Sequence, residues 1–184
     1  LITEMTSRPD ILDPGANPAS SQYLSALIKN LDDAVYADEY FASARGRLAD
    51  RVIFTGYLDH DRLSDILACA EIAVAPSIFP EAFGLVAVES LAAGIIPLLA
   101  NHSGFQDVIR EVVEEFSDTF DEARFEPLFL DGDFALNLAG NISAFLDYYG
   151  EMDEEVRQEI RRRARDIAVP RYSWGTIARS YLDL

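Results

Sequence analysis

Apolar residues in this chain fall into short continuous runs that alternate with amphipathic stretches. A run of about four to eight apolar, largely β-branched residues predicts a buried strand, and apolar positions three and four residues apart predict a helix. The predicted strands are 51–57, 71–77, 95–100 and 127–133, with a weaker one at 1–5. The predicted helices are 62–69, 80–94, 103–116, 134–149, 152–168 and 171–182, with a broken helical pattern across 21–48.

Residues that begin and end helices agree with this pattern. Asp59 or Asp61 is placed to cap the helix that starts near Arg62, and Gly94 to end the helix before the third main strand. The prolines and the glycine within 7–20 predict a loop. Short buried strands that alternate with helices are typical of a parallel sheet covered on both faces. We therefore expect an α/β fold with a doubly wound parallel sheet, in one domain that spans residues 1–184 and ends in terminal helices at 151–184.

The charge of the chain excludes one class of partner. The 32 Asp and Glu residues outnumber the 15 Lys and Arg residues, which gives a net charge of −17. Nucleic acids and anionic membranes are polyanions, so we expect neither as a partner. The arginines between 161 and 165 follow a group of acids, and we interpret them as the solvated face of a surface helix.

The distribution of apolar residues predicts the cellular location of the protein and the environment of its single cysteine. No apolar run reaches the roughly 18 residues of a membrane span, and the start of the chain does not resemble a signal peptide. We expect a soluble, cytoplasmic protein without a transmembrane segment. Cys69 lies in an apolar run and is predicted to be a buried, inert thiol, and Trp174 is predicted to be a packing anchor.

Several catalytic motifs are missing from the sequence. It contains no glycine-rich dinucleotide fingerprint and no phosphate loop ending in Gly-Lys-Ser/Thr. His60 and His102 are the only histidines, and neither has a metal-ligand spacing around it, so we expect no metal site and no cofactor. The Ser103 next to His102 lacks a second histidine to act as its base, which leaves serine-hydrolase chemistry unsupported.

Two glutamates, Glu81 and Glu89, bracket an apolar stretch directly after the predicted strand 71–77. In one continuous helix their carboxylates would be separated by about 12 Å along the axis and by about 80° around it, too far apart to act on one bond. Glu81 lies at the predicted helix start, where free backbone N–H groups and Gly84 would form an anion site. The alternative is that Glu81 only complements the helix dipole and that Glu89 faces solvent.

The position of these acids favours an extended ligand without excluding the structural alternative. A ligand with a hydroxylated head, an anionic middle and a hydroxylated tail would contact Glu81, the N–H groups and Glu89 in turn. A nucleotide sugar has that order of parts. The carboxyl ends of parallel strands are where open α/β folds bind ligands, and this motif follows such an end.

Residues 74–100 resemble the donor-binding signature of the retaining glycosyltransferases of family 4, whose two Rossmann-like domains form the GT-B fold. The matching residues are Pro76, Ser77, Glu81, Phe83, Gly84, Leu85, Glu89, Gly94 and Pro97, with one residue inserted before the proline. Residues 50–58 resemble the family's strand and base-contacting turn. Residues 103–109 resemble its Gly-Gly-x-x-Glu loop, with Ser103 and Asp107 in place of the first Gly and the Glu. The resemblance extends over about residues 50–184.

The resemblance implies a role for each part of the site. Glu81 would be the catalytic residue that contacts donor sugar hydroxyls near the reacting carbon, and Glu89 would hold the ribose. The donor would be a nucleotide-diphosphate sugar, transferred with retention of configuration and without an obligatory metal. The other implied donor-binding residues are Phe83, Gly84 and Leu85 at the diphosphate, Gly56, Tyr57 and Leu58 at the base, and Ser103 and Gly104 in the second loop.

Some parts of the family's pattern are missing here. Residues 1–49 match poorly, and the Arg and Lys that neutralise the diphosphate are not found, because Lys29 lies outside that motif. We therefore expect most of a carboxyl-terminal donor domain, inactive alone, whose acceptor sugar or lipid is bound by a missing amino-terminal domain. The alternatives are a non-catalytic sugar-nucleotide-binding or interaction module of the same fold, and a relative of glucan synthases or disaccharide phosphorylases.

Overall fold

The structure, a computed structural model, describes residues 42, 51–53, 55, 57–120 and 127–182. The chain divides into two units, 1–57 and 58–184, and every element labelled below belongs to the second unit. The strand predicted at 1–5 and the loop at 7–20 lie outside the described residues. So does the helical pattern across 21–48, except for Ala42, which is helical.

The described part of the second unit contains six helices and two strands. The helices are α4 (His60–Ala68), α5 (Leu85–Ala92), α6 (Phe105–Phe116), α7 (Phe134–Glu151), α8 (Glu154–Tyr172) and α9 (Trp174–Leu182). The strands are β1 (Ile72–Ala75) and β2 (Ile96–Leu99). The predicted strands at 71–77 and 95–100 are thereby confirmed, as are the helices predicted at 103–116 and 134–149.

Local sequence explains where several helices begin and end. The Asp59 carboxylate accepts a hydrogen bond from the Arg62 N–H at 3.0 Å, so Asp59 rather than Asp61 caps α4. Asp153 caps α8 in the same way. Gly94 ends α5 with a φ of 83°, in the left-handed region that glycine adopts without steric cost. The Ile95 N–H then donates to the Ser90 carbonyl at 2.9 Å, which closes the helix as predicted.

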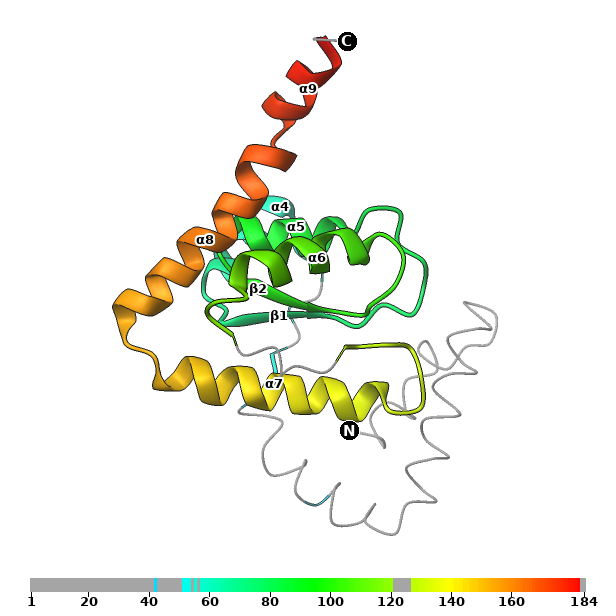
Figure 1. Ribbon diagram of the computed structural model, residues 1–184, viewed down its shortest axis with the longest axis vertical. Coiled ribbons are helices and arrows are strands. Elements are labelled where there is room, and N and C mark those ends of the chain that lie inside the picture. The colour runs from blue at the N-terminus through cyan, green and yellow to red at the C-terminus, as the bar shows by residue number, and fades with distance from the viewer. Residues whose placement is uncertain (1–41, 43–50, 54, 56, 121–126, 183–184) are drawn as a thin grey trace. The chain divides into compact units, whose positions relative to one another are not determined.

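The two strands form a parallel sheet in which Ile72 lies opposite Ile96 and Ala75 lies opposite Leu99. In Figure 1, α5 and α6 cover one face of this sheet and α7 covers the other. The carboxyl ends of both strands and the N-termini of α5 and α6 lie at the same end of the sheet (Figure 1). The α/β arrangement with helices on both faces agrees with the prediction. The doubly wound strand order stays a prediction, because two strands do not test it.

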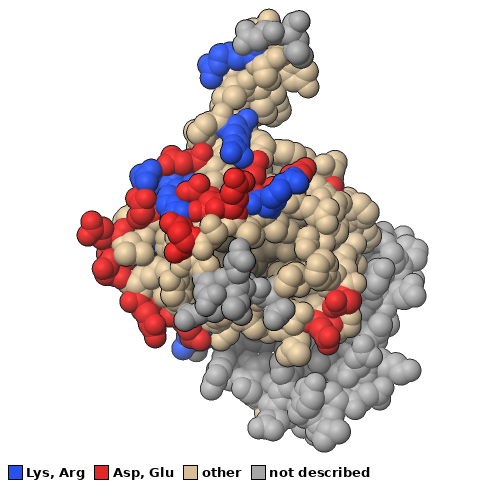
Figure 2. Space-filling view, viewed as in Figure 1, with Lys and Arg blue, Asp and Glu red and all other residues tan. Residues whose placement is uncertain are grey.

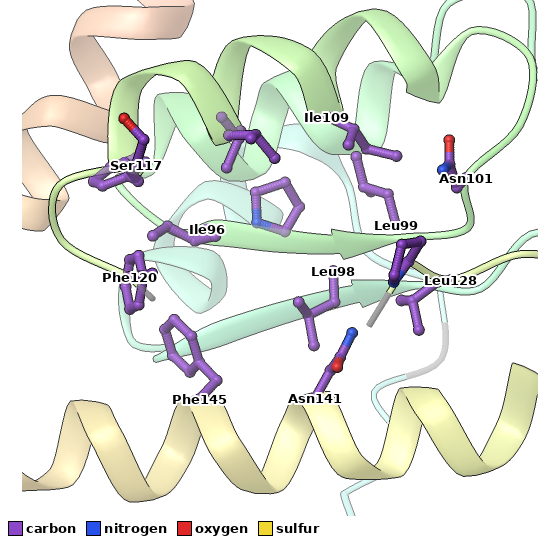
Figure 3. Close-up of a pocket in the computed structure, with 15 residues that line it drawn as sticks. Ile96, Leu98, Leu99, Asn101, Ile109, Ser117, Phe120, Leu128, Asn141 and Phe145 are labelled. Carbon is purple, nitrogen blue, oxygen red and sulfur yellow. The ribbon is translucent and has the colours of Figure 1, made fainter. Parts of the chain in front are cut away.

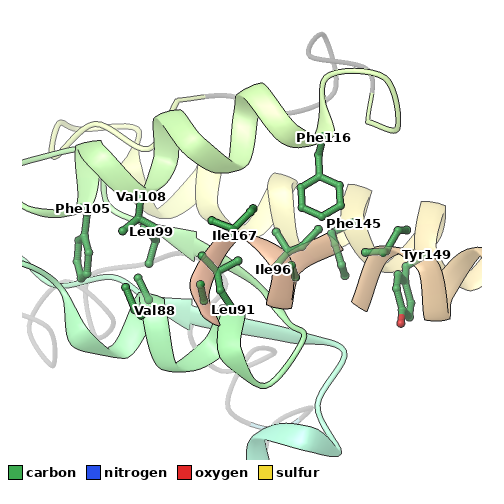
Figure 4. Packing of buried hydrophobic residues seen from close by; sticks show 14 residues of the cluster. Val88, Leu91, Ile96, Leu99, Phe105, Val108, Phe116, Phe145, Tyr149 and Ile167 are labelled. Carbon is green, nitrogen blue, oxygen red and sulfur yellow. The ribbon is translucent and has the colours of Figure 1, made fainter. Parts of the chain in front are cut away.

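The hydrophobic core lies between the sheet and the helices, as Figure 4 shows. Leu91, Phe105 and Val108 are completely buried on α5 and α6, and Phe145 reaches the sheet from α7 with 1% of its surface exposed. Burial of each side chain of this size contributes about 1.5–3 kcal/mol. The apolar face of α5 also packs against α8, whose buried residues are Ile160, Ala164, Ile167 and Ala168.

Arginines of α8 bind the carbonyl ends of two other helices. Arg161 donates to the carbonyl oxygens of Ala68 and Ala70, at 3.3 and 2.8 Å, where α4 ends. Arg157 donates to two carbonyls in the last turn of α7, at 3.1 and 3.0 Å. Arg162 pairs with acids on α8 itself. These cations satisfy carbonyl groups that a helix end leaves without partners, and Figure 2 shows acidic and basic side chains intermixed around α8.

Two of the predicted strands are not found in the part of the chain that the structure describes. The described residues of 51–57 form no strand, and Ile53 is 88% exposed. Residues 127–133 contain bends and turns, although the Leu128 carbonyl accepts a hydrogen bond from the Asn101 N–H at 2.7 Å. An apolar, β-branched composition favours a strand, but the backbone also needs a neighbouring strand to satisfy its N–H and C=O groups along its whole length. The amino-acid sequence of one strand does not indicate whether such a neighbouring strand exists.

Three other predictions are wrong in detail. Cys69 is exposed rather than buried. Trp174 begins α9 with 84% of its surface exposed, so it is not a packing anchor within the described residues. Helix α8 continues through Pro170 to Tyr172, beyond the predicted end at 168, so the arginines between 161 and 165 lie in its middle. Within the described residues, no helix combines the length and apolar character needed to cross a membrane.

Candidate functional site

The first part of the candidate site is the loop between β1 and α5. Gly84 has a φ of 78° and is the N-cap of α5, so the helix begins at Leu85 and not near Glu81 as the sequence suggested. Left-handed backbone at Gly84 interrupts the helix. Glu81 therefore precedes the helix, and Glu89 lies about one turn inside it. The separation calculated for one continuous helix does not apply to these carboxylates.

The second part of the site is the loop between β2 and α6. Ser103 in this loop has a φ of 46° and is the one non-glycine residue with a positive φ in the part of the chain that the structure describes. Left-handed backbone costs a residue with a side chain about 1–2 kcal/mol, so surrounding contacts must hold Ser103 in place. The next residue, Gly104, is the N-cap of α6.

The two loops are joined by hydrogen bonds at Glu81. The Glu81 N–H donates to the Ser103 hydroxyl oxygen at 2.9 Å, and the Gly104 N–H donates to the Glu81 carbonyl at 2.9 Å. A Cβ on Gly104 would lie 2.7 Å from both the Glu81 carbonyl oxygen and the Phe83 nitrogen. This backbone contact has room only for glycine. The predicted catalytic residue is thus held through its backbone on both sides.

The N-termini of α5 and α6 meet beside these loops. A Cβ on Gly84 would lie 2.5 Å from the ring of Phe105, the first residue of α6, so the start of α5 packs directly on that ring. No described residue accepts a hydrogen bond from the backbone N–H groups at positions 82–86. Free N–H donors at positive helix ends form a site for an anion.

Glu89 lies next to the start of α4. Its carboxylate oxygen Oε1 is 3.7 Å from Nδ1 of His60, a distance that makes an ion pair when the imidazole is protonated. The Glu89 side chain is 35% exposed and that of His60 is 87% exposed, so both remain accessible to a ligand. Leu58, half-buried, directly precedes the cap of α4. Among the described residues, no group of three or more His, Cys, Asp or Glu side chains is arranged to hold a metal ion.

The end of α8 anchors the first loop through Phe83. The rings of Phe83 and Tyr172 meet edge to face with centroids 5.3 Å apart. The Tyr172 hydroxyl donates to the Glu111 carboxylate, with both oxygens at 3.0 Å, and Arg171 pairs with the same carboxylate at 2.6 Å. Burial raises the pKa of Tyr172 above its ordinary value of 10.0, and the hydrogen bond to Glu111 raises it further, since both disfavour the phenolate.

Substitution of Tyr172 by phenylalanine is expected to lower the free energy of unfolding by about 1 kcal/mol at neutral pH, through loss of the hydrogen bond to Glu111. Because the folded-state pKa of Tyr172 is raised, the stabilisation by its hydroxyl is fully present below pH 10.0, its ordinary pKa, and is lost as pH rises through the folded-state pKa. The parent should therefore lose more stability than Tyr172→Phe as pH rises above 10.0.

Urea unfolding at several pH values measures this difference. Tyr181→Phe is the matched control at neutral pH, because that ring is 74% exposed and its loss of a hydroxyl should change the unfolding free energy by less than about 0.5 kcal/mol. Parallel pH profiles for the parent and Tyr172→Phe would contradict the anchoring role assigned to this hydroxyl.

The structure brings most of the predicted site residues together. Those joined by the contacts above are Glu81, Phe83, Gly84, Ser103 and Gly104, and Leu85 begins α5 beside them. Glu89 lies further along the same helix. Gly56 lies outside the described residues, and Tyr57 belongs to the other unit and is 95% exposed. A base pocket lined by these two residues and Leu58 stays a prediction.

Sequence reasoning matched Ser77 to the signature without giving it a role, and it gave His102 no part in the site. Nε2 of His102 is 2.6 Å from the Ser77 carbonyl oxygen, and its Nδ1 is 2.9 Å from the Ser103 hydroxyl. The spacing along the chain gave no motif, so His102 was set aside. One signal was available: Ser77 follows β1 and His102 follows β2, and the carboxyl ends of adjacent parallel strands lie at the same edge.

A separate apolar cavity of about 560 Å³ lies between β2, α6 and α7 (Figure 3). Asn141 and Phe145 reach into it from α7, and Ile109 contributes from α6. Its lining is apolar except for Asn101, Ser117 and Asn141, and it includes none of the residues of the predicted donor site. The cavity therefore offers few polar groups to a nucleotide, and we do not place the donor there.

Comparison with known proteins finds a family match over the part of the chain that contains the two loops. Residues 36–118 match the family model of glycosyl transferases group 1. This range contains Glu81, Glu89 and both loops of the candidate site, and it ends shortly after α6.

Individual relatives are distant. An uncharacterized glycosyltransferase of Methanocaldococcus jannaschii is 33% identical over 63 residues, which are 34% of this chain and 16% of that protein. A phosphatidyl-myo-inositol mannosyltransferase of Mycobacterium tuberculosis is 29% identical over 133 residues, which are 72% of this chain and 32% of that protein, and the protein of the same name from Mycobacterium bovis gives the same values. The chain thus matches about a third or less of the length of these relatives. Together the matches relate this part of the chain to glycosyltransferases.

Proposed function

We propose that this chain is the donor-binding part of a retaining, metal-independent glycosyltransferase that takes its sugar from a nucleotide-diphosphate sugar. The observation that carries the proposal is the junction of the two loops at Glu81. There a glutamate fixed through its own backbone lies beside the free N–H groups at positions 82–86 and the N-termini of α5 and α6. Anionic phosphate groups are the ligand class that helix N-termini bind.

Each part of the donor has a counterpart in this arrangement. Glu81 contacts hydroxyls of the transferred sugar, and the N–H groups that follow it hold the diphosphate. Glu89, about one turn inside α5, accepts hydrogen bonds from the ribose hydroxyls. For the base, the resemblance implies Gly56, Tyr57 and Leu58, and this assignment stays a prediction because Gly56 lies outside the described residues. The structural alternative for Glu81, a simple dipole-favouring acid in a first helical turn, loses its basis because Glu81 precedes the helix.

The backbone supplies the electrostatic part of the mechanism. When the bond between the sugar and the diphosphate breaks, negative charge develops on the leaving diphosphate. Fixed N–H donors and positive helix ends stabilise that charge without having to reorient, which lowers the barrier to bond cleavage. This role matters here because Lys29, the single lysine of the sequence, lies outside the family motif whose lysine neutralises the diphosphate.

The acceptor requires a second site. In the GT-B arrangement a preceding Rossmann-like domain binds it, and the present chain completes a doubly wound donor domain. The mycobacterial relatives are named for phosphatidyl-myo-inositol and for mannosyl transfer, which favours a hexose donor and a lipid-linked or sugar acceptor. A non-catalytic module of the same fold would bind the same nucleotide but transfer nothing.

Glu89→Gln is expected to weaken nucleotide binding about tenfold, because a charged acceptor of the ribose hydroxyls becomes a neutral one. Calorimetric titration of UDP, GDP and ADP into the full chain measures the Kd and identifies the base. Glu155→Gln is the matched control, since that glutamate is exposed in the first turn of α8, away from the two loops. Absence of binding by the parent at millimolar concentration would refute the donor-site assignment.

Transfer itself separates the enzyme from the module. Incubation of the preferred nucleotide sugar with the full-length protein and a panel of sugar and lipid acceptors should give a glycoside with the anomeric configuration of the donor, as read by proton NMR. Binding without any transfer would favour the module, and a product of inverted configuration would refute retention.

A further inference from the structure

Three contacts connect the carboxyl end of β1 to the backbone of Glu81. The ring nitrogen Nε2 of His102 lies 2.6 Å from the Ser77 carbonyl oxygen, and Nδ1 lies 2.9 Å from the Ser103 hydroxyl oxygen. The same hydroxyl oxygen accepts the Glu81 N–H at 2.9 Å. The four residues form one continuous hydrogen-bonded relay, which we call the His102 relay.

The chemistry of the relay assigns the proton on His102. A carbonyl oxygen only accepts, so Nε2 of His102 must carry a hydrogen and donate it to Ser77. In a neutral imidazole Nδ1 is then an acceptor, and the Ser103 hydroxyl donates to it. That leaves the Ser103 oxygen free to accept from Glu81. Each group has one partner of the correct kind, and the half-buried ring is held in a single tautomer.

Ser103 needs such support because of its backbone. Its φ of 46° is a conformation that glycine adopts without steric cost and that a residue with a Cβ disfavours. Backbone in this region persists only where the surrounding contacts determine it. The Ser103 side chain makes two of the relay's three contacts, so the same atoms that hold its backbone also hold Glu81.

We infer that His102 is a positioning residue that orients Glu81 toward the donor sugar through Ser103, an inference that rests on the function proposed above. The rest of the first loop has contacts of its own. Phe83 is held by its contact with Tyr172, and Gly84 by the ring of Phe105. Loss of the relay should therefore disturb the contact of Glu81 with the sugar and leave the diphosphate and ribose contacts in place.

The test compares two ligands in each variant: the nucleoside diphosphate and the corresponding nucleotide sugar, titrated into the full chain. In His102→Gln the amide can still donate toward Ser77 but offers no acceptor to Ser103. In His102→Asn the shorter amide keeps an oxygen near the position of Nδ1. We expect the ratio of the two Kd values to shift about tenfold against the nucleotide sugar in His102→Gln and in Ser103→Ala, and by less in His102→Asn.

Controls separate this role from a general loss of structure. Ser143→Ala, an exposed serine on α7, should leave both Kd values within about twofold of the parent. Two NMR readouts need no ligand: the ¹⁵N shifts of His102 should show a protonated Nε2 and an unprotonated Nδ1, and the Glu81 amide should exchange faster in His102→Gln. Both readouts depend on the hydrogen bonds of the His102 relay and not on packing of the His102 ring.

The outcomes are distinct. If the parent binds nucleotides and His102→Gln weakens both ligands equally, or neither, the positioning role is wrong while the donor site stands. If the parent binds neither ligand, the proposed function fails, and the inference about His102 fails with it.

Discussion

Replacement of Phe105 by alanine is expected to lower the free energy of unfolding by about 3–5 kcal/mol, the largest effect on stability that we predict for a single substitution here. The ring is completely buried and lies directly against the backbone of Gly84, where a Cβ would be 2.5 Å away. It also meets the ring of His102 at a centroid distance of 6.0 Å. Removal of the ring leaves a cavity under the start of α5 that hydrogen-bonded loops cannot fill by collapsing.

Chemical denaturation of the two proteins gives this difference directly. Phe129→Ala is the matched control, because the same ring is removed from a residue that is 51% exposed, and its cost should stay below about 1 kcal/mol. Similar losses for both substitutions would show that the Phe105 ring does not support the loop junction. Nucleotide binding should also weaken in Phe105→Ala, since Gly84 loses the surface that holds it.

Gly104→Ala is expected to have the largest effect on ligand binding. The new Cβ would lie 2.7 Å from the Glu81 carbonyl oxygen, 2.7 Å from the Phe83 nitrogen and 2.8 Å from the Ala82 carbonyl carbon. All three are backbone atoms, so no side chain can rotate away and the two loops must separate. We expect a loss of about 1–3 kcal/mol in stability and a weakening of nucleotide affinity by more than about tenfold, which corresponds to more than 1.4 kcal/mol.

Gly140→Ala provides the control for a methyl group added without a clash. Nothing lies within 4 Å of a Cβ at this position in α7, and alanine is the better helix former, so the variant should gain about 0.5–1 kcal/mol and bind nucleotide as the parent does. Calorimetry and unfolding on the same preparations test both variants. Parent-like binding by Gly104→Ala would mean that the loop contact is not required for the site.

The elements that the sequence predicted best are those in which local chemistry and tertiary packing agree. Helix α6 begins after Gly104 and follows an amphipathic repeat, and α8 begins at Asp153, whose carboxylate caps it. Such signals lie within a few residues of the structure they specify. The strands β1 and β2 were also predicted, because each is a short apolar run bounded by a turn or by polar residues.

The start of α5 shows where local signals mislead. Pro80 and Glu81 are typical of a first helical turn, and from sequence the helix is expected to begin there. The structure begins it at Leu85 because Gly84 adopts a φ of 78° against the ring of Phe105. Glycine is compatible with both helical and left-handed backbone conformations. The conformation of Gly84 therefore depends on its contact with Phe105 and not on its neighbours in the sequence.

Burial was predicted less well than secondary structure. Cys69 and Trp174 were expected inside because residues of these types usually are, yet both are exposed in the structure. His102 was the opposite case, a residue without a motif that takes a defined place between two loops. The parallel pairing of β1 with β2 brings its partners close to it. The spacing of residues along the sequence does not reveal that pairing.

The arginines of α8 determine when the fold can be completed. Arg161 closes the end of α4 by hydrogen bonds to residues up to 93 positions earlier in the chain, and the apolar face of α5 packs against α8. A ribosome that has delivered the chain up to Glu151 has made both strands and both loops of the candidate site, but α5 still lacks its neighbour and α4 its last hydrogen bonds. Long sequence separations of this kind delay folding during synthesis. We expect the donor site to become functional only after α8 has left the exit tunnel, late in the synthesis of the chain.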